Sequence, residues 1–237
     1  MVLACPNVRE MEGKSFKAAT IGRCANRIAY GKVHLHGEEV QLDTNDGNTG
    51  NFIHGGAGNY AFKLFSGEIT GENTVRMSLT DMGEGGFGDR VEVKIDFSFG
   101  DDRRLVIHYE LTPERETVLC PTNHAYFNLG DFTDARDMEL TLYASNLAHR
   151  GPSGVPEGGL DPVGGTGFDF TSPKAIGKGI EELTNGHLGF DDFYVLDRER
   201  EDNLISVLYS EKTGRVMNTY TDMQSAIIYT PLNCAGK

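Results

Sequence analysis

Hydrophobic residues recur most clearly at every second position, which is the period of a β-strand with one buried face. In "VEVKIDFSF" (91–99) apolar and polar residues alternate, and "LVIHYEL" (105–111) repeats the alternation after the turn "GDDRR". The two runs predict an antiparallel hairpin with one face in the core and the other in water. The side chains expected on the core face are Val91, Val93, Ile95, Phe97, Phe99, Leu105, Ile107, Tyr109 and Leu111.

Shorter runs of the same kind predict further strands along the whole chain. They are "TVRMSLT", "MELTLYA", "FYVL", "ISVLYS", "VMNTY" and "AIIYT". "GKVHLHGEEVQL" predicts a second hairpin that turns at Gly37. Many short strands separated by turn signals are typical of an all-β sandwich or barrel.

Two segments depart from this pattern. "SPKAIGKGIEELTNG" predicts one or two helical turns that begin after Ser172 and end by Gly186. The segment 151–170 is rich in Gly and Pro and lacks periodicity, so we expect a long loop there. Long loops of this kind are often functional, although a surface loop without a function can have the same composition. No repeat or linker divides the sequence, so we expect a single domain over 1–237.

Composition narrows the class of partner. The chain has 237 residues, 30 of them glycines, which suits a sizeable core with many turns. Its formal net charge is −13, from 22 Lys and Arg against 35 Asp and Glu. Nucleic acids and anionic membranes both need a basic protein surface, so neither is expected as a partner. A neutral ligand fits better.

The cysteines and the lengths of the apolar runs indicate the cellular compartment in which the protein is expected. Cys5, Cys24, Cys120 and Cys234 are widely spaced and form no C-x-x-C pair, so neither a zinc site nor a disulfide framework is expected. Reduced thiols suit a cytoplasmic protein. The N-terminus lacks the apolar core of a signal peptide, and no run reaches the roughly 20 residues of a membrane helix.

Candidate chemistry lies in four non-periodic stretches: "IGRCANRIAYGK", "NFIHGGAGNY", "PTNHAYFNLG" and "GFDDFYVLD". Asn26 and Arg27 offer donors for hydroxyl and carbonyl oxygens. His54 precedes two glycines that leave space beside its ring, His124 lies among small and aromatic residues, and Asp191 follows Gly–Phe.

Taken singly, each of these residues also has a structural interpretation. Arg27 could form a surface ion pair, His54 could fill a turn, and His124 could bond a backbone carbonyl. Asp191 or Asp192 could cap a turn.

A metal site is a further alternative. His34 and His36 would share one face of a strand, and His54 with His124 and a carboxylate could form a facial triad. Neither set is accompanied by ligands at a diagnostic spacing, so no metal is expected.

Five stretches taken in order resemble the aldose 1-epimerase (galactose mutarotase) family. "FKAATIGRCANRIAYGK" resembles its G-R-x-A-N-R-I segment, "NFIHGGAGNYAFKLF" its L-H-G-G stretch, and "TVLCPTNHAYFNLGDF" its T-N-H-S-Y-F-N-L segment. "GVPEGGLDPVGGTGFDFTSPKAIG" is similar to its P-V-x-G-T-P-F-D-F loop, and "GFDDFYVL" to its G-Y/F-D-H-N-F motif. The resemblance runs from about Val2 to Thr230.

This resemblance implies a large antiparallel β-sandwich with an open sugar-binding cleft. It also implies a cofactor-free isomerase that interconverts the α and β anomers of free aldohexoses such as galactose or glucose. His124 matches the general acid, and His54 matches a second histidine that orients the sugar and supports charge at the ring oxygen.

The remaining matches are to sugar-binding positions. Asn26 and Arg27 match a hydroxyl-binding pair, Tyr126 lines the sugar site, and Asp191 matches the carboxylate that holds sugar hydroxyls. The expected partner is a monosaccharide, and the expected assembly is a monomer or homodimer.

The sequence departs from the family pattern at several points. Asp192 and Phe193 replace His and Asn, and Ile227 stands where many members carry Gln. The family's general base is a glutamate on a strand that would follow Lys237, and the first strands would precede "MVLACPNV". We therefore expect a chain that lacks both ends of the pattern and is marginally stable and poorly active alone. The internal glutamates that match no catalytic position include Glu110, Glu157 and Glu181.

Two alternatives follow from these departures. One is a sugar-binding protein of the same fold without catalysis. The other is a relative that acts on a hexose 6-phosphate, which calls for extra cations beside the sugar. Only Arg23 and Arg27 are candidates for that role.

Overall fold

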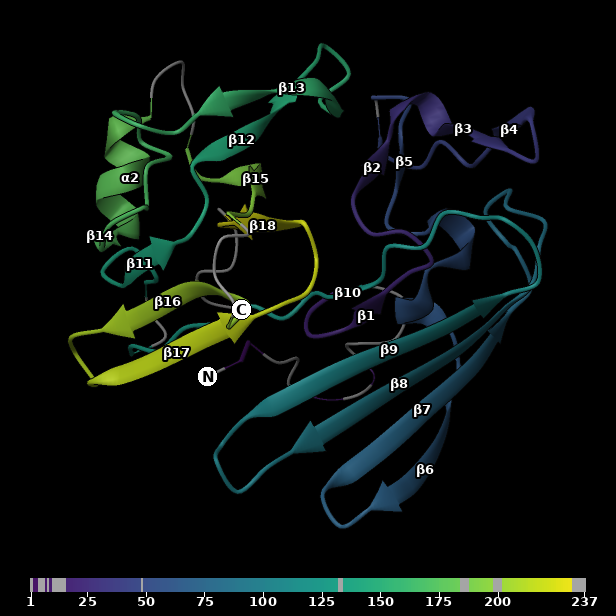
Figure 1. Ribbon diagram of the computed structural model, residues 1–237, viewed down its shortest axis with the longest axis horizontal. Coiled ribbons are helices and arrows are strands. Elements are labelled where there is room, and N and C mark those ends of the chain that lie inside the picture. Colours follow the sequence, from purple (N-terminus) through teal and green to yellow (C-terminus); the bar gives the residue numbers. More distant parts are fainter. Residues whose placement is uncertain are drawn as a thin grey trace. The chain divides into compact units, whose positions relative to one another are not determined.

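The computed structural model describes residues 2–3, 7, 9, 16–47, 49–131, 134–183, 188–197 and 202–231. The chain folds as two compact units. The N-terminal unit is Leu3–Tyr126, and the C-terminal unit is Phe127–Lys237 with Met1–Val2. Strands dominate both units and every named strand pairing is antiparallel, which confirms the all-β prediction (Figure 1).

The N-terminal unit is built on one four-stranded meander. Its strands are β6 (Ser66–Gly71), β7 (Thr74–Asp81), β8 (Val91–Phe99) and β9 (Leu105–Pro113), which lie side by side in that order (Figure 1). Val91 pairs with Pro113 and Phe99 with Leu105, so the hairpin predicted from alternation is confirmed.

The core face of this sheet follows the predicted alternation for most of its length. Val91, Val93 and Ile95 are at most 1% exposed and pack with Tyr60. Phe99 and Leu105 are each 57% exposed, so the prediction that they face inward was wrong. They pair at the closed end of the hairpin, beyond the buried cluster. Alternation gives the side of a strand on which a residue lies, but it does not say how far the core extends along that strand.

Short elements complete the N-terminal unit. β1 (Thr20–Ile21) pairs with β10 (Thr122–Asn123), β2 (Arg27–Ile28) pairs with β5 (Phe52–Ile53), and β3 (Lys32–Leu35) pairs with β4 (Glu38–Gln41). Three 3-10 turns accompany them, η1 (Ala29–Gly31), η2 (Gly56–Gly58) and η3 (Tyr60–Phe62).

The predicted turn at Gly37 is confirmed. His36 and Gly37 have φ values of 57° and 81°, the left-handed conformations that a two-residue hairpin loop uses.

The C-terminal unit contains two four-stranded sheets. One has the order β14 (Lys174–Ala175), β11 (Glu139–Leu142), β16 (Leu204–Ser210), β17 (Arg215–Tyr220). The other has the order β13 (Pro156–Pro162), β12 (Asn146–Arg150), β15 (Asp191–Val195), β18 (Ser225–Tyr229). Leu140 and Leu208 of the first sheet share one buried cluster with Tyr194 of the second, which is the packing of a sandwich.

All six shorter runs that predicted strands form strands in the two units. The predicted helical turns are also present as α2 (Ile176–Glu182), although Gly186 lies outside the described residues. Within the described part of the chain, no helix has the length and apolar character that crossing a membrane requires.

The segment 151–170 was wrongly predicted to be a loop throughout. Residues 156–162 form the edge strand β13, which pairs with β12 from Asn146↔Pro162 to Arg150↔Pro156, with a register shift between Ala148 and Arg150. Almost every β13 residue is exposed, so no hydrophobic alternation marks it. An edge strand tolerates proline because one of its sides needs no ladder hydrogen bonds.

Candidate functional site

His124 is held at the end of a short strand pair. β10 pairs with β1 through Thr20↔Asn123 and Ile21↔Thr122. The His124 backbone N–H donates to the Ala19 carbonyl at 2.8 Å, and the Ala18 N–H donates to the His124 carbonyl at 3.0 Å. Residues just before the "GRCANRI" motif therefore fix the backbone of His124 on both sides.

His54 is held by the neighbouring pair of strands. β5 pairs with β2 through Arg27↔Ile53, and the His54 N–H donates to the Asn26 carbonyl at 3.1 Å. The Asn26 N–H donates in return to Nδ1 of His54, also at 3.1 Å. Because a backbone N–H can only donate, Nδ1 is the unprotonated nitrogen. Neutral His54 therefore carries its hydrogen on Nε2 and acts there as a donor.

The two histidines meet inside a group of aromatic rings. Their ring centroids are 5.4 Å apart and the rings are edge-on at 78°. Tyr126 lies 5.1 Å from His124, and Phe16 lies 5.4 Å from His54 and 6.1 Å from His124. We call Phe16, His54, His124 and Tyr126 the histidine cluster. The N-terminal unit thus brings together the predicted site residues His54, His124 and Tyr126. A fourth, Asn26, is hydrogen-bonded to His54.

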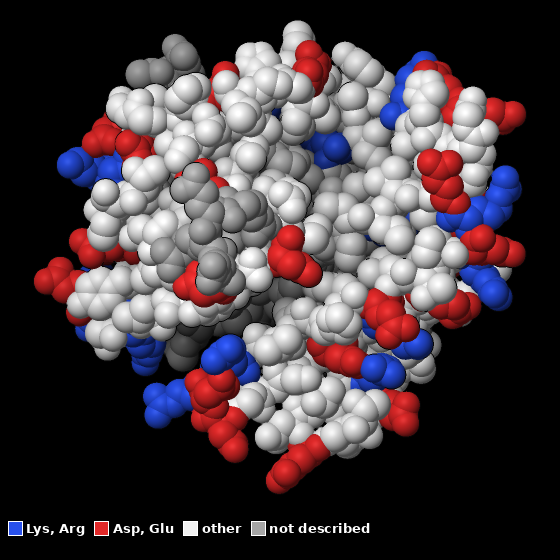
Figure 2. Space-filling model, in the orientation of Figure 1, with Lys and Arg blue, Asp and Glu red and all other residues white. Residues whose placement is uncertain are grey.

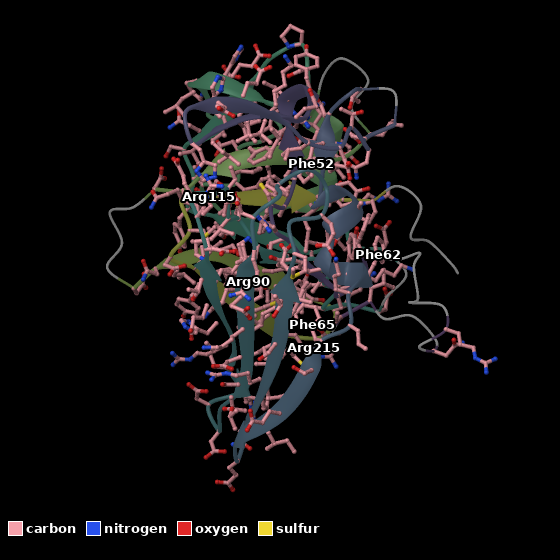
Figure 3. All side chains as sticks on the ribbon, turned by 90° about the vertical axis from the view of Figure 1, so that its right-hand side faces the viewer. Phe52, Phe62, Phe65, Arg90, Arg115 and Arg215 are labelled. Carbon is pink, nitrogen blue, oxygen red and sulfur yellow. The ribbon has the colours of Figure 1, made fainter. Side chains whose placement is uncertain are left out.

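Phe16 and Phe62 are members of the site region that the sequence did not single out. Phe62 lies 5.6 Å from Phe16, and its side chain is 47% exposed. Figure 3 labels Phe62, which comes from η3, together with Phe52, which is fully buried. Both Phe16 and Phe62 occur within the family-like stretches, but sequence gives no sign of which aromatic rings remain open to solvent.

Arg27 is oriented by a carboxylate that the sequence analysis missed. Its Nε donates to Oδ2 of Asp46 at 2.7 Å, with 20% and 18% of the two side chains exposed. Burial disfavours the charged form of Asp46, but hydrogen bonds from Arg27 and Thr49 together hold the pKa of its carboxyl below the usual value. The Asn26 side chain accepts from the Arg27 N–H at 2.7 Å. The predicted Asn26–Arg27 pair is therefore locally ordered.

Arg23, considered above as a second cation near the sugar, is a structural residue. It is 1% exposed, and its three guanidinium nitrogens donate to Asp81 Oδ2 at 2.9 Å, Thr117 Oγ1 at 3.1 Å and the Asp89 carbonyl at 2.6 Å. Tyr60 also donates to Asp81 Oδ2, at 2.9 Å. Of the two candidate cations, Arg23 is buried among its partners, whereas Arg27 is partly exposed beside Asp46.

Asp191 belongs to the C-terminal unit, so its place in the histidine cluster stays a prediction. It begins β15 opposite Tyr229. Arg150 lies 3.9 Å from its carboxylate and 3.7 Å from that of Asp192. Arg150 is a basic residue that the sequence analysis did not single out.

His34 and His36, weighed as metal ligands, have different surroundings. His34 lies on β3 opposite Glu39, whereas His36 lies in the turn, with Nε2 3.0 Å from Asp89 Oδ2. Among the described residues no group of three or more His, Cys, Asp or Glu side chains has the arrangement of a metal site.

Figure 2 shows how charge is distributed on one face of the molecule. Lys and Arg side chains are interspersed among Asp and Glu side chains there, and the described residues of that face form no continuous basic patch. A hollow in the C-terminal unit is likewise lined by charges of both signs, including Arg136, Glu181 and Lys212. None of the six predicted site residues lines it.

Gly55 allows the close approach that fixes His54. Its φ is 89°, and a Cβ there would collide with the Gly22 carbonyl oxygen. We expect Gly55→Ala to lower the free energy of unfolding by about 3 kcal/mol or more. The matched control is Gly37→Ala, because Gly37 has a φ of 81° with open space around it. That change should cost only about 1 kcal/mol of backbone strain. If urea denaturation gave the same loss of unfolding free energy for both variants, the contact between Gly55 and the Gly22 carbonyl could not be the cause.

Comparisons with known proteins give matches over almost the whole chain. A family model described as "Aldose 1-epimerase" matches residues 1–236. Galactose mutarotase from Sus scrofa is 30% identical over 234 residues, which cover 97% of this chain and 67% of that protein. Aldose 1-epimerase from Escherichia coli (strain K12) is 34% identical over 221 residues, which cover 91% and 63%.

Solved structures agree with these matches. The GalM/aldose epimerase homologue from C. elegans has a TM-score of 0.83 at 24% identity, covering 92% of this chain and 66% of that one. Galactose 1-epimerase from Lactobacillus acidophilus has a TM-score of 0.78 at 26% identity, covering 89% and 63%. The predicted galactose mutarotase-like fold is confirmed. The chain spans about two thirds of the length of these relatives.

Proposed function

The chain belongs to the aldose 1-epimerase family, and from this premise we propose that it interconverts the α and β anomers of a free aldohexose such as galactose or glucose. The observation that carries the proposal is the pair of histidine rings, 5.4 Å apart, delivered by β5 and β10. Each histidine is tied by its backbone to the segment that also carries Asn26 and Arg27.

The reaction requires two proton movements. The ring oxygen must gain a proton and the anomeric hydroxyl must lose one, so that the C1–O5 bond opens. Rotation about C1–C2 and reclosure on the other face of the carbonyl then invert the anomeric centre. Positioned acids and bases typically contribute about 10²–10⁴-fold each to such steps.

His124 is the proposed acid. Imidazole has an ordinary pKa of about 6.5, so both its protonation states are accessible near neutral pH. His54 has a different role, because its Nδ1 is occupied by the Asn26 N–H. Through Nε2–H it can donate to the ring oxygen and stabilise negative charge that develops there. The two histidines thus divide proton transfer and charge stabilisation between them.

The remaining residues of the proposal bind the sugar. Asn26 and Arg27 hold hydroxyls, Tyr126 lines the sugar site, and Asp191 of the C-terminal unit accepts from vicinal hydroxyls. The glutamate base that the family resemblance implies corresponds to no residue of this sequence. The residues named in this proposal supply the acid and bind the substrate.

Polarimetry of freshly dissolved α-D-galactose tests the proposal. We expect the chain to speed the approach to the equilibrium rotation above the buffer rate. A rotation curve identical to that of buffer, with galactose binding retained, would instead indicate a non-catalytic sugar-binding protein.

Binding measurements separate free sugars from sugar phosphates. Because Arg23 is buried in its ion pair with Asp81, we expect galactose 6-phosphate to bind no more tightly than galactose. Much tighter binding of the phosphate in a calorimetric titration would overturn the free-sugar proposal.

Asp46 should matter for substrate binding through Arg27. We expect Asp46→Ala to weaken galactose binding about tenfold, because the Arg27 guanidinium loses the carboxylate that fixes its Nε edge. Asp46→Asn keeps an oxygen acceptor for Arg27 and Thr49 and should recover part of the affinity. Unchanged affinity in both variants would show that the orientation of Arg27 does not contribute to binding.

Phe62 should extend the sugar-binding surface beyond the histidine cluster. An exposed aromatic face next to Phe16 can pack on the apolar C–H face of a pyranose. We expect Phe62→Ala to weaken galactose binding about threefold to tenfold. Leu64→Ala is the control, because Leu64 is apolar, lies two residues away and is 94% exposed. A similar loss in both variants would contradict a specific role for Phe62.

A further inference from the structure

Two cysteines that the proposed reaction does not use lie directly opposite each other in the N-terminal unit. Cys24 and Cys120 form an isolated parallel bridge. The Ala25 N–H donates to the Cys120 carbonyl at 2.7 Å, and the Cys120 N–H donates to the Arg23 carbonyl at 3.0 Å. These two hydrogen bonds set the backbone register of the pair.

This register suits a covalent link. Paired backbone segments lie about 4.8 Å apart, and disulfides join residues whose Cα atoms are about 4.4–6.8 Å apart. Both thiols are free, and both side chains pack in the same apolar cluster. We propose that Cys24 and Cys120 are a reversible disulfide-forming site that reacts with a two-electron oxidant of the peroxide class.

The two thiols are not equivalent. Cys24 is 7% exposed, whereas Cys120 is only half-buried. A hydrogen bond from Cys24 lowers the pKa of the Cys120 thiol to about 7, against the opposing effect of burial. The same hydrogen bond, together with burial, raises the pKa of Cys24. Cys120 is therefore the more accessible and more acidic thiol, which makes it the first nucleophile.

The chemistry proceeds in two balanced steps. The Cys120 thiolate attacks one peroxide oxygen, the O–O bond breaks, and Cys120 becomes a sulfenic acid as hydroxide leaves and takes up a proton to form water. The Cys24 sulfur then attacks the Cys120 sulfur, an S–S bond forms, and the sulfenic hydroxyl leaves as a second water with the thiol proton. Two thiols are oxidised and one peroxide is reduced.

The disulfide would link the two segments that carry the candidate site. Cys24 lies two residues before Asn26, and Cys120 lies four residues before His124. The link would close a long loop of chain between them and restrict the unfolded state, so the oxidised form should be the more stable one. The alternative is that both cysteines serve only as small apolar side chains in the core.

Peptide mass mapping after oxidation decides between these roles. The chain is prepared with Cys5→Ser and Cys234→Ser, so that Cys24 and Cys120 are its two thiols, and is treated in its folded state with one equivalent of hydrogen peroxide. We expect a loss of mass equal to two hydrogen atoms, a linked Cys24–Cys120 peptide, and a midpoint temperature raised by several degrees. Dithiothreitol should reverse all three changes.

Single substitutions test the order of attack. In Cys24→Ser, dimedone should capture the Cys120 sulfenic acid, whereas in Cys120→Ser the same treatment should leave Cys24 unlabelled. The proposal is overturned if the peroxide-treated double-serine chain keeps both thiols or carries Cys120 on to a sulfinic acid without a link. Mass mapping of the double-serine chain gives this result even if neither single-cysteine variant folds.

Discussion

Replacing Arg23 by methionine is expected to lower the free energy of unfolding by about 3–5 kcal/mol. The change keeps an unbranched side chain but leaves the Asp81 carboxylate buried without its cation. It also leaves Thr117 and the Asp89 carbonyl without donors. Breaking one side of a buried pair is costly because the remaining charge stays out of water. Urea denaturation of the two chains measures the difference.

The control for Arg23 is an arginine–aspartate pair that is more exposed to solvent. Arg76 donates through Nε and Nη2 to Asp96 at 2.7 Å and 2.6 Å, across β7 and β8. Arg76→Met should have a far smaller effect, because water can solvate Asp96 when the arginine is removed. Comparable losses for the two arginines would contradict the structural role assigned to Arg23.

His124→Gln is expected to reduce the catalysed anomerisation of galactose by at least about 100-fold, or to the buffer rate. Glutamine preserves hydrogen bonding but cannot carry a proton to the ring oxygen at neutral pH. Galactose binding should change much less than the rate, because the hydroxyl contacts are assigned to other residues. Polarimetry gives the rate, and a binding titration gives the affinity.

The control for His124 is an exposed histidine with a carboxylate partner. His149 of the C-terminal unit lies 3.0 Å from Asp161, and its side chain is 54% exposed. His149→Gln should leave the rate unchanged. If His124→Gln retained the full rate while His149→Gln lost it, the acid would have to be sought outside the histidine cluster.

Much of the fold could be predicted because alternation reports directly on half-buried strands. "VEVKIDFSF" and "LVIHYEL" formed the expected hairpin, and the six shorter apolar runs formed strands in the two units. The edge strand β13 was missed because its residues are exposed and carry no alternation. A strand of that kind is defined by backbone hydrogen bonds to its neighbour. The pattern of hydrophobic and polar side chains does not report those bonds.

The candidate site could be predicted only as an ordered set of motifs. His54 and His124 are 70 residues apart in the sequence and lie in separate stretches. Only the structure, in which β1 pairs with β10 and β2 pairs with β5, shows that their rings meet. Sequence also could not separate Arg23 from Arg27, which lie in one motif four residues apart. Arg23 is buried against Asp81, whereas Arg27 is partly exposed beside Asp46. Neither carboxylate lies in the motif, so the motif alone cannot show this difference.

The central claim is that this chain exchanges the anomers of a free aldohexose through His124. Saturation transfer between the α and β anomeric protons of galactose at equilibrium measures that exchange directly, without a change in net composition. We predict that saturating one anomeric signal attenuates the other when the chain is present, and that the attenuation disappears with His124→Gln. Equal attenuation with both proteins, or none with the unsubstituted chain at a galactose concentration that saturates binding, would contradict the claim.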